Sequence, residues 1–237
     1  MKTIKDDELL SGTKIRSLFD LIITADEYSN YLLNHGWSFL SNGFPDFTNK
    51  QTFFLKTMPN DIIPYPQRNN WMIPSKNKVV ICFFCRDYLL YRRLSSVLHD
   101  IPELKKYGGV VEMDITVTEG MDKDWQDFLM LLNQLYMAIL IENGIFVMPN
   151  TRCGDSATIG NLAHIPKNVI WCSSFLGCKN ISSNEGLSGY IDKVLSLNPQ
   201  MIIIYGKHDK RLEKQLDIVG VNYKVYKDFR RKNWQRR

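Results

Sequence analysis

Two aspartates, Asp87 and Asp114, each lie within two residues of the end of an apolar run, and they are the strongest candidates for chemistry in this chain. The runs, residues 79–85 and 110–113, have the length and the Val and Ile content of buried strands. Two carboxylates at neighbouring strand ends could share a divalent cation or act as general acid and general base. We therefore predict both as catalytic residues and as ligands of a divalent cation. The alternative is that each aspartate caps the helix that follows it.

The loop after the apolar run at residues 145–148 contains three polar side chains, Asn150, Arg152 and Asp155. We predict that the Arg152 guanidinium clamps an anion, and that Asn150 contacts the same substrate. Asp155 is predicted to act as a catalytic base or a ligand. The alternative is that Arg152 and Asp155, three residues apart, only pair with each other in a turn.

Two later strand ends add hydroxyl groups and a histidine. Ser173 and Ser174 follow the run at 169–172 and could present donors to a phosphate, although a flexible turn would have the same composition. His208 follows the run at 201–205 and is the histidine found at a predicted strand end, so we predict that it transfers a proton. The predicted substrate-binding residues are Asn150, Arg152, Ser173, Ser174, Tyr205, Gly206 and Lys207.

These residues can form one site only in a fold that brings the ends of several strands close together. Predicted helices alternate with the apolar runs, at residues 88–104, 124–142, 156–163, 187–197 and 210–219, and a last strand is expected at 222–226. Runs without polar alternation are typical of parallel strands covered on both faces, and such sheets bind ligands at their carboxyl ends. We predict an α/β fold with a mostly parallel sheet of about six βα units. A TIM-like barrel, complete or incomplete, is favoured over an open doubly wound sheet, because no glycine-rich phosphate loop follows the first strand.

The chain is predicted to divide into three parts. Residues 1–75 form an arm, with helical pieces at 14–23 and 27–33 and then an irregular stretch rich in Asn, Pro and Gly. The many aromatic residues of this stretch indicate that it packs on the core. Residues 76–226 form the α/β core, and residues 227–237 form a basic tail.

The tail explains most of the net charge of +5, because residues 224–237 hold seven basic side chains and one acidic one. Basic and aromatic side chains together could neutralise phosphates and stack on bases, which predicts nucleic acid as a partner. The alternative is a solvated terminus. The predicted nucleic-acid-binding residues are Lys227, Arg230, Arg231, Lys232, Trp234, Arg236 and Arg237.

Composition excludes several classes of protein. No apolar stretch reaches the roughly 18 residues of a membrane span, and the first residues lack the apolar segment of a secretory signal, so we expect no membrane partner and a cytoplasmic location. Five cysteines, an odd number, favour a reducing compartment, and the pair Cys82 and Cys85 is interpreted as core thiols. The sequence contains no GxGxxG, Walker A, HExxH or GxSxG motif.

Several segments resemble a family of bacterial, phage and mobile-element proteins catalogued as domain of unknown function 4417. The segments are residues 83–88, 110–115, 142–149, 165–168 and 203–206, together with Ser173, Gly177 and Cys178. The resemblance implies a phage or mobile-element setting but no established activity. It carries over Asp87, Asp114, Ser173, Tyr205 and Gly206 as site positions.

The chain departs from the family pattern at two places. Residues 133–140 are largely apolar where relatives carry Asn, Arg and aromatic residues, and 152–155 read Arg-Cys-Gly-Asp where relatives show Trp and Ser. If these positions line the site, the resemblance implies altered or lost chemistry in this chain.

Two functions follow as hypotheses. The first is an enzyme of a phage or mobile element that acts on a phosphate-containing substrate, a nucleotide or a nucleic acid, at the strand ends. The second is a noncatalytic protein that binds nucleic acid or a host protein through its basic aromatic tail.

Overall fold

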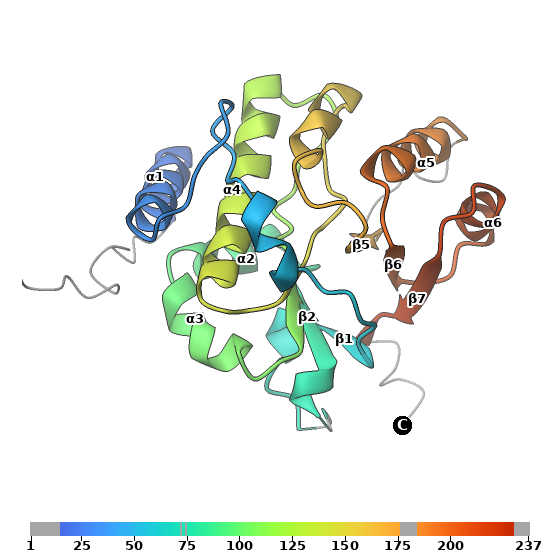
Figure 1. Cartoon of the computed structure of the whole chain (residues 1–237), viewed down its shortest axis with the longest axis horizontal. Coiled ribbons are helices and arrows are strands. Elements are labelled where there is room, and N and C mark those ends of the chain that lie inside the picture. The colour runs from blue at the N-terminus through green and yellow to red at the C-terminus, as the bar shows by residue number, and fades with distance from the viewer. Residues whose placement is uncertain (1–14, 72, 74, 176–183, 230–237) are drawn as a thin grey trace, which may run out of the picture.

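The computed structural model describes residues 15–71, 73, 75–175 and 184–229 (Figure 1). Seven strands form two sheets with parallel pairing throughout, which confirms the α/β class. The four-stranded sheet has the order β1-β2-β3-β4, and the three-stranded sheet has the order β5-β6-β7. The strands are β1 (Asp61–Pro64), β2 (Val79–Cys82), β3 (Gly109–Val111), β4 (Val147–Met148), β5 (Ile170–Ser174), β6 (Met201–Gly206) and β7 (Tyr223–Lys227).

Helices separate the strands less regularly than six βα units would require. The α-helices are α1 (Leu18–Asn34), α2 (Asp87–Leu94), α3 (Val97–Leu104), α4 (Lys123–Glu142), α5 (Asn184–Leu197) and α6 (Lys210–Ile218). The 3-10 helices are η2 (Thr48–Phe53), η3 (Tyr65–Gln67), η4 (Lys76–Lys78) and η5 (Ser156–Leu162). Strands β2, β3, β5 and β6 lead into α-helices, whereas β1 and β4 lead into 3-10 helices. None of the described helices is long and apolar enough to cross a membrane.

The two sheets meet edge to edge at the segment around Leu55. The Leu55 backbone N–H donates to the Val147 carbonyl oxygen over 2.9 Å, and its carbonyl accepts from the Ile170 N–H over 3.3 Å. Further along, Asn150 and Cys172 form an isolated parallel bridge. Within the described part of the chain the strands do not close into a barrel, so the established fold is a pair of parallel sheets.

Helix α4 lies at the centre of the molecule, with α1 packed against it (Figure 1). It begins at Asp122, whose side chain accepts from the N–H groups of Asp124 and Trp125, and it ends before Gly144, which has a φ of +76°. Residues from Leu132 to Ile141 are all buried. A helix that is apolar on all sides belongs in the interior, and this explains the long apolar stretch noted in the sequence.

A second, smaller apolar cluster lies on the other face of the strands. Every strand contributes to it, through Ile62, Val80, Cys82, Val111, Met148, Ile170, Cys172, Ile203, Tyr205 and Tyr226. Because successive side chains of a strand point to opposite faces, the strands need apolar residues at every position. This requirement produced the continuous runs of the sequence.

Strand β1 lies inside the arm that the sequence predicted to be irregular. It pairs with β2 in parallel, with Asp61 opposite Val79 and Pro64 opposite Cys82. Its apolar run consists only of Ile62 and Ile63 between prolines and an asparagine, and therefore resembles a loop. The two helical pieces expected before it form one helix, α1, which is capped by Ser17 and Asp20 in a capping box.

Candidate functional site

The ends of β3 and β4 bring together Asp114, Arg152 and Asn150. One Asp114 carboxylate oxygen accepts from Arg152 Nε and from Asn150 Nδ2, both over 2.6 Å, and the other accepts from Arg152 Nη2 over 2.9 Å. The side chains of Asp114 and Arg152 are only 7% and 19% exposed. We call these three residues the Asp114 cluster. It is a buried, bidentate ion pair with an amide on its flank.

Opposing effects act on the pKa of Asp114. Burial raises it, whereas the charge and hydrogen bonds of Arg152, and then the hydrogen bond of Asn150, lower it. The nearby carboxylate of Asp87 raises it further. The net result is a pKa above the usual value for aspartate, because the effect of burial outweighs that of the pairing with Arg152.

Glu112 is a site residue that the sequence interpretation missed. It is 3% exposed, and its Oε2 accepts from the backbone N–H of Asn150 over 2.8 Å. Burial raises the pKa of Glu112 to about 8. A narrow pocket without room for a water-sized sphere lies between Glu112, Asn133 and Gln134 of α4, and Arg152. A single acidic residue inside the apolar run at 110–113 was the signal that could have identified Glu112.

Hydroxyl groups form a buried chain at the end of β5. The Ser173 hydroxyl hydrogen-bonds to the hydroxyls of Thr151 and Tyr190, the latter over 2.7 Å. Burial raises the pKa of Tyr190 beyond its usual range. Ser173 is thus one strand away from the Asp114 cluster, with its hydroxyl engaged by protein groups. Ser174, the last residue of β5, is half-buried.

Asp87 lies at the start of α2 and interacts with the loop after β3. Its Oδ1 accepts from the Thr116 hydroxyl over 2.9 Å, and it is not the cap of α2, because Arg86 holds that position. Its effect on the pKa of Asp114 indicates that the two carboxylates are neighbours. Among the described residues no group of three or more His, Cys, Asp and Glu side chains could hold a metal ion. Metal binding by Asp87 and Asp114 therefore stays a prediction.

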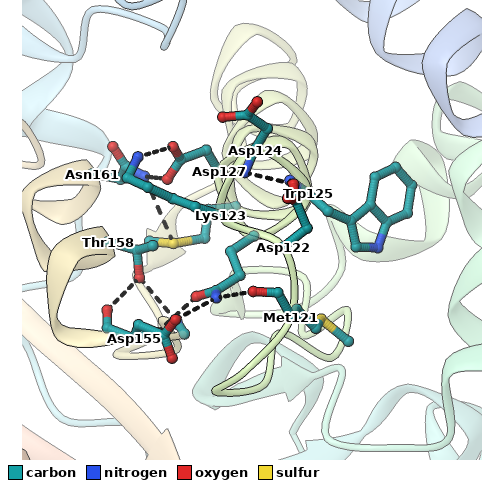
Figure 2. A network of polar contacts seen from close by, with 12 residues as sticks. Met121, Asp122, Lys123, Asp124, Trp125, Asp127, Asp155, Thr158 and Asn161 are labelled. Carbon is teal, nitrogen blue, oxygen red and sulfur yellow. Dashed lines mark hydrogen bonds and ion pairs between the residues drawn. The ribbon is translucent and has the colours of Figure 1, made fainter.

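The Asp155 carboxylate binds residues at the start of α4 and just before it (Figure 2). Its Oδ1 accepts from the Gly120 N–H over 3.1 Å, and its Oδ2 accepts from Gln126 Nε2 over 2.8 Å. Its own N–H donates to Gln126 Oε1 over 2.7 Å. A Cβ on Gly154 would lie 1.7 Å from the same Gln126 oxygen, so the approach requires glycine. Asp155 joins the loop after β4 to the start of α4, and it does not pair with Arg152.

Of the predicted site residues at the end of β6, some lie in the interior and others on the surface. The Tyr205 hydroxyl donates to Asp228 over 3.2 Å and accepts from the Phe229 N–H over 3.0 Å, and Gly206 is buried behind it. Lys207 is exposed. His208 is 61% exposed, and its Nδ1 lies 3.0 Å from Glu213 of α6. The structure therefore places His208 with α6 and not with the Asp114 cluster.

Little of the predicted nucleic-acid-binding tail is within the described residues. Lys227 is the last residue of β7 and is exposed. Arg230, Arg231, Lys232, Trp234, Arg236 and Arg237 lie outside the described residues, as do Gly177 and Cys178.

The fold and the strand-end cluster define an α/β protein with parallel sheets and a buried polar site at their carboxyl edge. Comparison with known families places it more narrowly. The model of a domain of unknown function, DUF4417, matches residues 43–224, and the chain belongs to this family. No curated protein and no solved structure matches the chain.

Proposed function

We propose that this protein is an enzyme with its site at the carboxyl ends of β3, β4 and β5, and that it takes a small phosphate-containing substrate such as a nucleotide. The single observation that carries the proposal is the Asp114 cluster, a bidentate ion pair buried at the edge of the sheet. The resemblance in the sequence favours a phage or mobile-element accessory role.

The energetics of the cluster support a functional role. A buried ion pair is often no more stabilising than apolar residues of similar volume, because both charges lose their hydration. The presence of such a pair at the edge of the sheet is therefore not explained by stability alone. Its position also fits, since α/β proteins bind ligands outside the carboxyl ends of parallel strands.

The chemistry of the cluster favours an anion. The planar guanidinium of Arg152 presents parallel N–H groups that fit a phosphate as well as they fit the Asp114 carboxylate. A phosphate that takes the place of Asp114 would leave this carboxylate without its cation. Loss of the Arg152 charge would remove an effect that lowers the pKa of Asp114, while burial continues to raise it, so the change favours uptake of a proton from solvent. Protonated Asp114 could then donate that proton to the substrate as a general acid.

We further propose that the seven strands form an incomplete barrel around the smaller apolar cluster. All seven strands contribute to that cluster. The Tyr226 hydroxyl of β7 donates to the Pro59 carbonyl, just before β1, which spans the two outermost strands. The Phe84 and Tyr205 rings stack at 5.7 Å across the same interior. This arrangement would direct all strand ends to one face, as in TIM-like barrels.

Calorimetric titration of the full-length protein with ATP and with inorganic phosphate tests the substrate class. We expect Arg152→Lys to weaken nucleotide binding about tenfold or more, because lysine keeps the charge but lacks the planar fork. Arg92→Lys is the matched control, since Arg92 is an exposed arginine of α2. Equal affinities for the wild-type protein and Arg152→Lys would contradict the proposal.

The alternative is a noncatalytic protein that binds nucleic acid or a host protein through its tail. The exposed Lys227 at the point where the chain leaves β7 is the observation that favours it. Truncation before β7 would also remove Tyr226 and its hydrogen bond to the Pro59 carbonyl, which would alter the fold. Neutralisation of the basic side chains tests the tail without this change. Glutamine at Arg230, Arg231, Lys232, Arg236 and Arg237 should abolish binding under this alternative and leave nucleotide binding unchanged.

A further inference from the structure

We propose that a second surface, remote in sequence from the tail, binds single-stranded nucleic acid by stacking an unpaired base on Trp71. The surface, which we call the Trp71 surface, consists of the connection between β1 and β2 and the turn after α3. Its side chains are those of Arg68, Trp71, Lys76 and Lys106, with the buried rings of Tyr65 and Tyr107 against Arg68 and Lys76. The inference does not depend on the proposed enzymatic function.

Trp71 is the first observation. Its side chain is 90% exposed, a larger fraction than for any other large hydrophobic residue in the described part of the chain. Burial of an aromatic side chain stabilises a folded protein strongly, and an indole exposed to water does not contribute this stabilisation. Among the described residues no aromatic side chain stacks on Trp71, and its exposed indole face is available to a planar ligand.

The second observation is that the segment before and after Trp71 is held in place by contacts of its other residues. The Arg68 guanidinium lies 4.0 Å from the centre of the Tyr65 ring, and its Nη1 donates to the Tyr65 carbonyl over 3.2 Å. The Tyr107 hydroxyl donates to the Arg68 carbonyl, which joins the connection to the turn after α3. Lys76 Nζ lies 5.2 Å from the centre of the Tyr107 ring. The surface is therefore organised before any ligand arrives, which lowers the entropic cost of binding.

Charge is the third observation. Residues 65–78 contain three basic side chains, Arg68, Lys76 and Lys78, and no acidic one. In the last turn of α3, Glu103 contacts both Lys76 and Lys106, at 2.7 Å and 2.5 Å, so one carboxylate is shared by two cations. The surface retains an excess of positive charge, although the chain before residue 224 is close to neutral. Phosphates are the complementary ligands of such a surface.

Stacking favours a single strand over a duplex. In a duplex the faces of the bases are covered by their neighbours, whereas unpaired bases can lie flat on an indole. Cations beside an aromatic platform then follow the phosphate backbone. The combination of one exposed tryptophan with basic side chains in the same connection therefore fits a single strand of DNA or RNA.

Fluorescence anisotropy with a labelled oligothymidylate of about 20 nucleotides tests the inference on the full-length protein, because this length exceeds one binding site. We expect Trp71→Ala to weaken binding about five- to one-hundredfold, and Trp71→Phe to retain most of the affinity. Arg68→Ala should lower the slope of log affinity against log salt by about 0.7, the value for one phosphate on a single strand. The same oligonucleotide in a duplex should bind more weakly.

Trp234→Ala is the matched control, because it removes the same side chain from the tail. A loss of affinity in Trp234→Ala with none in Trp71→Ala would overturn the inference and favour the tail. Equal affinities for the single strand and the duplex would also overturn it, as would the absence of binding by the wild-type protein. Thermal melting of Trp71→Ala should match the wild-type protein, since Trp71 is 90% exposed and contributes little to the core.

Discussion

The ends of β3 and β4 differ sharply from the end of β6, although the sequence predicted similar roles for both. At β3 and β4 the polar side chains face one another in the interior, and Asp114 binds Arg152 and Asn150. At β6 the histidine is 61% exposed and pairs with Glu213 of the helix that follows it, α6. The difference teaches that a polar residue after a strand belongs to a common site only where the next residues stay buried.

The course of the backbone explains this difference. After β4 the chain continues beside β5, where the Thr151 N–H donates to the Cys172 carbonyl over 2.9 Å, so Asn150 and Arg152 remain next to the sheet. After β6 the chain turns directly into α6, whose cap is Asp209. His208 therefore leaves the sheet with the helix. Four changes test how different the two strand ends are.

Removal of the Arg152 charge should have the largest effect. We expect Arg152→Met to lower the free energy of unfolding by about 3–5 kcal/mol, because it leaves the Asp114 carboxylate buried and unpaired. Urea denaturation at pH 7 measures this loss. The double variant Asp114→Asn with Arg152→Met should recover most of it, since no buried charge remains. A double variant as unstable as the single one would show that Arg152 acts through packing and not through charge.

The next largest effect concerns Glu112 and pH. Because burial raises its pKa from 4.5 to about 8, the folded state binds the proton more tightly than the unfolded state. Stability from this group is complete below pH 4.5 and is lost as the pH rises through 8. We expect a loss on the order of 3 kcal/mol over that range, and Glu112→Gln should remove this part of the pH dependence. Identical pH profiles for the two proteins, measured by urea denaturation, would contradict the assignment.

His164 should show a pH dependence of opposite sign. Its ring is half-buried, with Phe44 and Phe47 as neighbours, and burial lowers its pKa from 6.5 to about 4. Stability from neutral His164 is therefore complete above pH 6.5 and is lost as the pH falls through 4. Partial exposure screens the effect, so we expect about 1–2 kcal/mol. His164→Gln should flatten the thermal stability between pH 4 and 6.5, and an unchanged acid transition would argue against this origin.

The smallest effect is expected at the end of β6. Because the pair of His208 with Glu213 is exposed, His208→Ala should change the free energy of unfolding by less than about 0.5 kcal/mol. High salt should reduce even this difference. A loss comparable with that of Arg152→Met would remove the distinction between the two strand ends.

Much of the fold could be predicted because burial on both faces leaves a continuous apolar signal. The predicted strands at 79–85, 169–172 and 201–205 overlap β2, β5 and β6, and the predicted helix at 124–142 is α4 within one residue. Strand β1 was missed because two isoleucines are too few for such a signal. The predicted helix at 88–104 is divided into α2 and α3. The order of strand pairing depends on contacts between distant residues, which no local pattern contains.

The site could be predicted in part, for a similar reason. Asp114, Asn150 and Arg152 were identified because they follow strands, but their mutual bonds depend on the pairing of β3 with β4. Asp155 and His208 are also polar residues that follow strands, yet they bind Gln126 and Glu213 instead. Glu112 was missed because an acidic residue inside an apolar run was treated as part of the strand.

The segment at Leu55 also determines when the molecule can be completed during synthesis. The Leu55 backbone forms hydrogen bonds with Val147 on one side and with Ile170 on the other. This early segment can therefore take its position between the sheets only after both partners have left the ribosome. Contacts between residues so far apart form late, because the loop between them must first be closed. Until then its neighbours in β4 and β5 have exposed backbone groups that a chaperone could shield. Assembly of the two sheets into one body is therefore a late step of folding.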